Sequence, residues 1–215
     1  MPRDGTQARA RLREAALELY RRRGYDETTT AQIAARAGVT ERTYFRHFAD
    51  KREVLFDGEA ELRAILVDAI AAAPPGLAPL PVLVRAFTAA VPLLVRNRPV
   101  AEQRAQVIAV TPALQERAYA KTAALTDTLA NALADRGVAP PTARLAAQVG
   151  MAAFERASRR WAGNPAVDLA ASIAQAADEV LTLGGKVRGW QRPQLSLTVA
   201  GHNNLLGKLG SDSVL

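Results

Sequence analysis

Hydroxyl, guanidinium, imidazole and ammonium groups crowd together between residues 28 and 51, in the stretch TTTAQIAARAGVTERTYFRHFADK. Hydroxyls beside helix N-termini suit phosphate oxygens, an arginine suits the O6 and N7 edge of guanine, and a glutamate can accept from N4 of cytosine. The chemistry available here is therefore hydrogen bonding to a polyanion. The same stretch also gathers several rings in a chain that is only 5% aromatic.

Three helical patterns must position these groups. Residues 12–20 repeat apolar side chains at the spacing of one helix face, which predicts a first helix that ends at Gly24. A second helix of about two turns follows the threonine cluster and stops at Gly38. Thr40 is placed to cap a third short helix.

Helical spacing separates the rings. Tyr44 and Phe48 lie at i and i+4, so both fall beneath the third helix and are predicted to be core residues rather than surface contacts. Phe45 and His47 fall on other faces of that helix. From the residues alone, a solvated imidazole is an open alternative for His47.

Two short helices that meet at ARAGVT after a supporting helix make a helix-turn-helix pattern, in which the second helix enters a DNA major groove. Residues 6–56 resemble the N-terminal domain of the TetR family of bacterial transcriptional regulators. The matching stretch is AALELYRRRGYDETTTAQIAARAGVTERTYFRHFADKREVL. The resemblance implies a DNA-binding domain at 6–56 and a ligand-binding and dimerisation domain at 57–185.

The resemblance also implies roles for the polar positions. Thr30 would cap the second helix and reach a phosphate, and His47 and Lys51 match positions that clamp phosphates. Phe45 stands where the family commonly has a phosphate-binding tyrosine, and Ala31 where some relatives have a base-reading arginine. The predicted DNA-binding residues are Thr30, Thr40, Glu41, Arg42, Thr43, Phe45, Arg46, His47 and Lys51.

Other arginines near the N-terminus have two interpretations each. The run at 21–23 is either a solvated helix end that complements the helix dipole or part of a basic surface. The second group either forms an arm along DNA or is simply solvated; it consists of Arg3, Arg9, Arg11 and Arg13.

Proline and glycine punctuation divides the rest of the chain into helices, without the alternating pattern of strands. Asp50 is expected to cap one long helix that runs to AAAPPGLAPLP. The further helices are predicted at 81–96 with a kink at Pro92, and at 99–110, 112–136, 141–162 and 165–183. The prediction is an all-α protein of about nine helices.

A protein that recognises a DNA half-site gains selectivity when it binds two half-sites as a two-fold dimer. The last two predicted helices carry alanine-rich faces that would permit close approach of a second copy. The alternative is that these faces pack only within one chain. The predicted dimer-interface residues are Leu145, Val149, Ala152, Arg156, Ile173, Ala177, Val180 and Leu181.

Large side chains in the middle of the chain are candidates for a ligand pocket, although most of them are expected to be ordinary core. Arg96 and Arg98 lie near Arg104, where they either receive an anionic group or form a solvated surface. The predicted pocket residues are Phe87, Val91, Arg104, Val107, Tyr119, Phe154 and Trp161.

The segment RNRPVAEQRAQVIAVTPALQERAYAKTAALTDTLANALADR, with the later ASRRWA, looks like the C-terminal domain of the mycofactocin-regulator type. This second resemblance implies an acyl-CoA-like effector. No cofactor is expected.

Charge and composition bear on rival functions. Residues 1–56 carry 12 basic and 8 acidic residues, whereas residues 57–183 carry 12 of each, so an architectural DNA binder, basic along its length, is disfavoured. An adapter that binds only protein would not need Thr40, Arg42 and Lys51 together. An enzyme or metal site is poorly supplied, because the chain has no cysteine and two histidines.

The remaining expectations concern location and the C-terminus. No secretory signal and no apolar run of about 18 residues stand out, which predicts a cytoplasmic protein without a membrane partner. Residues 186–215 are rich in Gly, Asn and Ser and are expected to be a tail, either flexible or an added extension.

Overall fold

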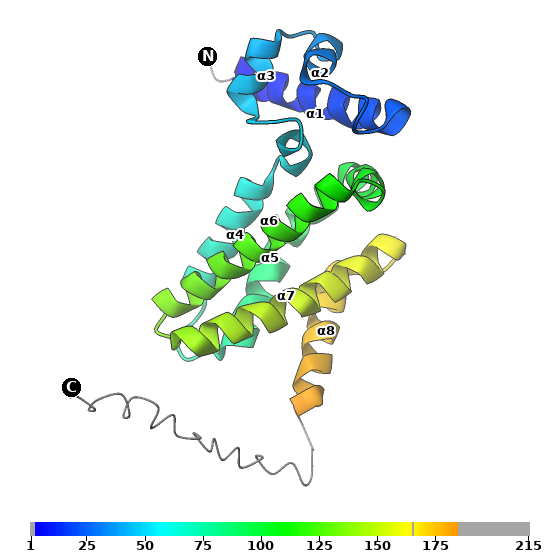
Figure 1. The fold of residues 1–215 in the computed structure, drawn as a ribbon. Coiled ribbons are helices and arrows are strands. Elements are labelled where there is room, and N and C mark those ends of the chain that lie inside the picture. Colours follow the sequence, from blue (N-terminus) through cyan, green and yellow to red (C-terminus); the bar gives the residue numbers. More distant parts are fainter. Residues whose placement is uncertain (1–2, 165, 185–215) are drawn as a thin grey trace, which may run out of the picture.

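The computed structural model describes residues 3–164 and 166–184, and this part consists of eight α-helices and one 3-10 helix, η1, without any strand (Figure 1). The elements are α1 Arg3–Arg23, α2 Thr30–Arg36, α3 Glu41–His47, η1 Glu53–Phe56, α4 Glu59–Ala71, α5 Pro79–Ala109, α6 Pro112–Asp135, α7 Pro140–Gly163 and α8 Leu169–Gly184. The predicted all-α fold is confirmed. The segment predicted as a tail, 186–215, lies outside the described residues.

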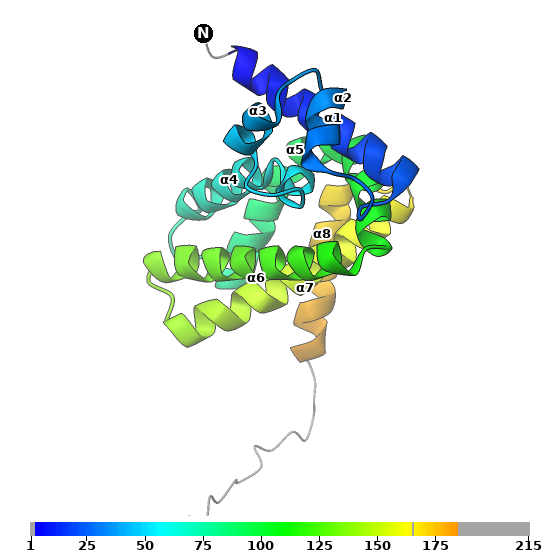
Figure 2. The ribbon, with the colours of Figure 1, turned by 45° about the horizontal axis from the view of Figure 1, so that its top comes forward.

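Helices α1–α3 form a small unit at one end of the molecule, above a body made of α4–α8 (Figures 1 and 2). Its core lies beneath α3, where Tyr44 is 0% and Phe48 3% exposed, as the spacing predicts. Leu12 of α1 joins this core, as do Val107 of α5 and Leu114 of α6. The unit is therefore fused to the body by shared apolar packing.

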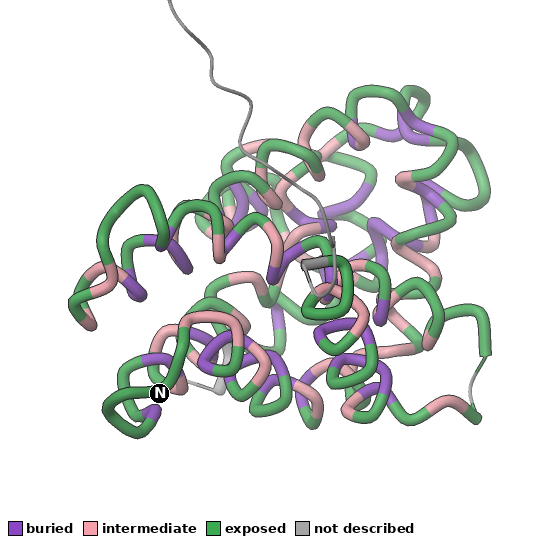
Figure 3. Tube along the Cα trace, turned by 90° about the horizontal axis from the view of Figure 1, so that it is seen from below, coloured by how far each residue is buried: buried purple, intermediate pink, exposed green. Residues whose placement is uncertain are grey.

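The body helices each bury one stripe and expose the other, which the alternating burial along the trace shows (Figure 3). Leu83 and Phe87 of α5, Leu129 of α6 and Ala147 of α7 meet in one core. Contacts between α6 and α7, and between α7 and α8, hold the C-terminal helices together.

The segment from Asp50 to Ala71 is interrupted, contrary to the prediction of one long helix. The Asp50 carboxylate accepts hydrogen bonds from the backbone N–H groups of Arg52 at 2.7 Å and Glu53 at 3.1 Å, as a cap does. The chain then forms only η1 and turns at Gly58, whose φ of +92° is left-handed and cannot continue a helix. Apolar spacing continues across the turn, so periodicity did not reveal it.

The two helices predicted at 81–96 and 99–110 are one helix, α5, with Pro92 and Pro99 inside it. An internal proline removes a backbone hydrogen bond and favours a kink. Both prolines lie on the exposed face, while Ala86, Phe87 and Ala90 are buried on the other side. Burial of that face maintains the helix despite the prolines.

Within the described ranges, α5 is the one helix with the length and hydropathy to cross a membrane. The two shorter helices predicted at 81–96 and 99–110 would each have been too short for this. It contacts α4, α6, α7 and α8. These contacts are those of the central helix of a packed bundle.

Gly150 of α7 provides a test of the α5–α7 packing. A Cβ at this position would lie 2.6 Å from Cδ1 of Leu83, which is fully buried, so the Leu83 side chain would have to shift within the core. We expect Gly150→Ala to be less stable than the matched Gly163→Ala by about 1–3 kcal/mol, because both gain helix propensity but only the first is overpacked. Gly163 has no atom within 4 Å of its Cβ position. Equal midpoints of urea unfolding for the two variants would contradict this account.

Candidate functional site

The threonine cluster caps α2, although at Thr29 and not at the predicted Thr30. Thr29 Oγ1 accepts from the N–H of Gln32 at 3.2 Å, and the Gln32 side chain accepts from the N–H of Thr29 at 3.0 Å, which completes a capping box. Thr30 is the first helical residue, and its hydroxyl donates to the Glu41 carboxylate across the turn. The predicted cap at Thr30 was wrong, because three adjacent threonines all satisfy the capping preference and only the backbone conformation selects among them.

The turn between α2 and α3 follows the helix-turn-helix pattern. Gly38 adopts a φ of +68°, and Thr40 caps α3 as predicted, with its Oγ1 accepting from the N–H of Thr43 at 3.2 Å. The hydroxyl groups of Thr40 and Thr43 lie 3.0 Å apart. The start of α3 is therefore both capped and lined with hydroxyls.

The outer face of α3 carries the polar groups that the sequence predicted for recognition. Glu41, Arg42 and Arg46 are exposed, and Thr43 is half-exposed. Neither arginine forms an ion pair with a residue that the structure describes. Phe45 is 53% exposed and meets the buried Tyr44 ring edge-on at 5.5 Å. This face combines free guanidinium groups, hydroxyls and one apolar ring.

His47 differs from the other predicted contacts, because it is partly enclosed. Its Nε2 atom is buried and has no hydrogen-bond partner among the described residues. Burial, together with the charges of Arg46 and Arg9, lowers the pKa of the imidazole below its ordinary value. The side chain is therefore neutral at pH 7 and brings no fixed positive charge to the face.

Lys51 is engaged within the protein. Its ammonium donates to the backbone carbonyls of Tyr25 at 3.0 Å, Thr28 at 3.2 Å and Asp26 at 3.5 Å, and lies 4.1 Å from the Tyr25 ring centroid. These three acceptors match its three donors. Lys51 thus ties the loop before α2 to the chain after α3, a role that a local motif does not reveal.

The arginines considered as a flexible arm belong to α1, which begins at Arg3. Arg9 and Arg13 lie 2.6 and 3.6 Å from the carboxylate of Asp57. Arg9 also lies 4.8 Å from the centroid of the Phe48 ring. These two side chains attach α1 to the chain ahead of α4 and are not free to form an arm.

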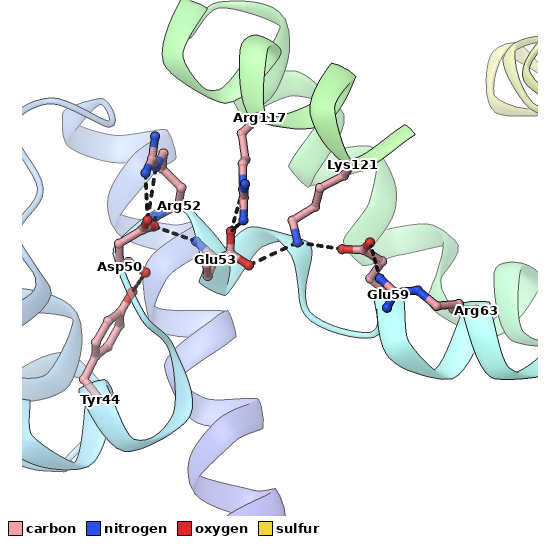
Figure 4. Close-up of polar contacts among 8 residues, drawn as sticks. All are labelled: Tyr44, Asp50, Arg52, Glu53, Glu59, Arg63, Arg117 and Lys121. Atoms are coloured by element: carbon pink, nitrogen blue, oxygen red, sulfur yellow. Dashed lines mark hydrogen bonds and ion pairs between the residues drawn. The ribbon is translucent and has the colours of Figure 1, made fainter. Parts of the chain in front are cut away.

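A row of charges joins the end of this unit to α6 (Figure 4). Glu53 of η1 accepts from Arg117 at 2.7 Å, and Lys121 lies 3.1 Å from Glu53 and 2.7 Å from Glu59 of α4. Burial opposes ionisation of Glu59, but hydrogen bonds and charge from Lys121 and Arg63 hold the pKa of this carboxyl below its ordinary value. Arg117 lies more than 60 residues from Glu53 in the sequence, and Lys121 lies more than 60 residues from both Glu53 and Glu59, so no spacing pattern signals these contacts.

A cavity of about 510 Å³ lies beside this row, within the size range of small-molecule sites. Among the predicted pocket residues, Arg104 and Trp161 line it. Lining residues that the sequence reasoning missed include Phe56, Leu62, Leu93, Val100 and Leu125. Several of them are ordinary core types, which carry no signal of a cavity.

The other predicted pocket residues have different positions. Phe87 is buried and stacks on Phe154 with 4.6 Å between ring centroids, and Val91 packs against the same body core. Val107 belongs to the core below α3, and Tyr119 is 76% exposed. None of these five lines this cavity, since large apolar side chains serve packing equally well, and a role for them in ligand binding stays a prediction.

The predicted dimer surface is divided by the fold. Ile173 and Ala177 are buried by the chain's own helices and cannot face a second copy. The other members remain at the surface, fully or partly; they are Leu145, Val149, Ala152, Arg156, Val180 and Leu181. Leu145 and Leu181 are the large apolar ones, at 61% and 59% exposed.

Lys51→Met tests the structural role of this lysine. We expect the free protein to lose about 1–3 kcal/mol of unfolding free energy, because carbonyl acceptors lose a charged donor. Arg46→Met is the matched control, and its exposed position predicts a change within about 0.5 kcal/mol. Urea unfolding without DNA measures both. A Lys51→Met protein as stable as wild type would leave phosphate binding as the remaining explanation for this residue.

Two family models match this chain, one over the helix-turn-helix unit and one over the helical body. The family model described as bacterial regulatory proteins, TetR family, matches residues 12–57, and the model described as MftR C-terminal domain matches residues 77–183. The HTH-type transcriptional regulator TcmR of Streptomyces glaucescens is 40% identical over 81 residues, which are 38% of this chain and 36% of that protein. The match thus spans about a third of the relative's length.

Solved structures share the fold. FadR of Thermus thermophilus, a TetR-family transcriptional repressor in complex with lauroyl-CoA, is 27% identical with a TM-score of 0.53, over 86% of this chain and 98% of that one. SmeT in complex with triclosan is 20% identical with a TM-score of 0.56, over 82% and 90% of the two chains, and shows the fold alone. The helix-turn-helix, the matched body and the common fold together establish that this chain belongs to the TetR family of bacterial transcriptional regulators.

Proposed function

We propose that this regulator binds a palindromic operator as a homodimer, acts as a repressor, and is released by a small hydrophobic or acyl-CoA-like effector. The observation that supports DNA reading most directly is the outer face of α3, where Arg42 and Arg46 are exposed beside the hydroxyls of Thr40 and Thr43. An arginine that is not held by a carboxylate keeps its donors for a base or a phosphate.

The proposed contacts divide by chemistry. Arg42 and Glu41 read base edges, and the hydroxyls of Thr40 and Thr43 with Arg46 bind backbone phosphates. Phe45 contributes ring packing against sugars, since it has no hydroxyl to donate. Thr30, His47 and Lys51 remain near this surface, but their engaged or uncharged groups favour positioning over charge neutralisation.

Effector control is supported by the ligands in related structures and by the cavity in this chain. The Thermus thermophilus relative is a repressor with lauroyl-CoA, and SmeT holds triclosan. The cavity here is bounded by Glu59 of α4 and Lys121 of α6. Both belong to the row of charges that connects α6 with the unit of α1–α3, which we call the reading unit. A ligand at this place is therefore positioned to bias the reading unit. A cytoplasmic location follows from this proposal, because the operator is cytoplasmic in bacteria.

Arg42→Ala tests direct readout. Selection of bound DNA from a random pool by the wild type is expected to enrich a palindrome, whereas the variant relaxes preference at one position of each half-site and binds about 1–3 kcal/mol more weakly. Arg85→Ala of α5 is the matched control, because it removes one exposed arginine of the body. Enrichment of no palindrome by the wild type indicates an architectural binder, and absence of DNA binding indicates a protein adapter.

Leu181→Glu tests the dimer. A carboxylate in a face that is buried between copies lacks a partner, so we expect a shift from dimer to monomer in analytical ultracentrifugation. Tyr119→Glu is the control, since Tyr119 is an exposed position on α6, a helix that contributes no residue to the proposed face. A wild-type protein that sediments as a monomer at all concentrations, or a Leu181→Glu protein that remains dimeric, contradicts the proposed interface.

A further inference from the structure

The cavity beside η1, α4, α5 and α6 combines apolar walls with seven charged side chains. Phe56, Leu93, Val100, Leu125 and Trp161 supply much of the apolar lining. Such walls exclude water from a bound chain and strengthen any charge interaction at their edge. The charges that line the cavity therefore decide which polar group a ligand must carry.

The three carboxylates of the lining are all neutralised by the protein. Their partners lie within ion-pair distance: Asp57 with Arg9 at 2.6 Å and Arg13 at 3.6 Å, Glu59 with Lys121 at 2.7 Å and Arg63 at 2.9 Å, and Glu61 with Arg96 at 2.9 Å. Lys121 has Glu53 as a second partner at 3.1 Å. A cationic ligand would find none of these acids free.

Arg104 is the exception among the cations of the lining. It forms no ion pair with any residue in the described ranges. Its one hydrogen bond there runs from Nη1 to the carbonyl oxygen of Leu55, at 3.4 Å. Burial, with the nearby charge of Arg13, lowers the pKa of its guanidinium, which nevertheless stays protonated at pH 7. A partly buried cation with most of its donors unused therefore borders an apolar cavity.

The neighbouring arginines do not share this property. Arg98 pairs with Glu102 at 2.6 Å and lies 4.5 Å from the Trp161 ring centroid, and Arg96 is held by Glu61. The basic cluster seen in the sequence thus reduces to one available guanidinium. Its position, rather than the local density of arginines, gives the cavity its polarity.

We propose that this cavity binds an amphiphilic anion, whose acidic head group pairs with the Arg104 guanidinium and whose apolar body lies against the walls toward Trp161. The inference rests on the proposed function, since it specifies the chemistry of the effector. Arg104 also touches the reading unit, because its acceptor, Leu55, is a 2% exposed member of the core below α3. An anion that draws the guanidinium away from this carbonyl changes a contact of η1 directly.

Decanoate and decanol provide matched probes, because they share an apolar chain and differ in charge. In isothermal titration calorimetry without DNA, we expect the wild-type protein to bind decanoate about ten- to hundredfold more tightly than decanol. Arg104→Met is expected to bind both probes alike, and Arg104→Lys to keep part of the preference for decanoate. Arg85→Met, which removes an exposed arginine of the same helix outside the lining, is expected to match the wild type.

Two results would overturn the proposal: equal affinity or no affinity of the wild type for the two probes, or an Arg104→Met protein that folds like the wild type and still prefers decanoate. Binding of the selected palindrome is measured separately, with no probe present. A protein that prefers decanoate but selects no palindrome contradicts the proposed DNA function and not the site. A protein that selects a palindrome but fails the probe test retains the DNA function and loses the site.

Discussion

Helices of seven residues do not persist alone in water, and both α2 and α3 have this length. Their stability depends on burial of one face and on satisfied ends. Tyr44 is fully buried beneath α3 and its hydroxyl donates to the carbonyl of Asp50 at 3.0 Å, so one side chain supplies both packing and a polar tie. Because the inner face of α3 is held in this way, Arg42 and Arg46 on its outer face are not needed to stabilise the helix.

The need to bury the inner faces of these short helices also explains why the unit of α1–α3 does not form a separate domain. Val107 and Leu114 complete its core from the corner between α5 and α6, and Glu53 is held by Arg117 and Lys121 from α6. Apolar packing makes the junction continuous, while the ion pairs fix its register. Partly exposed ion pairs stabilise little by themselves, so their importance here lies in geometry rather than in binding strength. A displacement of α6 acts on both kinds of contact at once.

Charge pairing gives the cavity its character. A bundle of mostly apolar helices has no need of seven charged side chains around one space, and six of them cancel through the pairs of Asp57, Glu59 and Glu61 with neighbouring cations. Arg104 is left over. This partly buried guanidinium keeps its proton at neutral pH, and no acid among the described residues pairs with it, which favours a ligand that supplies the counter-charge. The electrostatic balance of the cavity and its link to η1 therefore meet at one residue.

Local backbone preferences and a period of 3.6 residues suffice to predict the all-α class, the three N-terminal helices, the cap at Thr40 and the division of Tyr44 and Phe48 from Arg42. Tertiary structure alone decided that α5 runs through two prolines, that Lys51 turns inward to three carbonyls, and that Ile173 is buried within the chain. It also decided that Arg104 alone lacks an acid among the cations of the cavity lining. Packing and charge pairing join residues that are far apart in the chain, and contacts over such sequence distances leave no trace in local spacing.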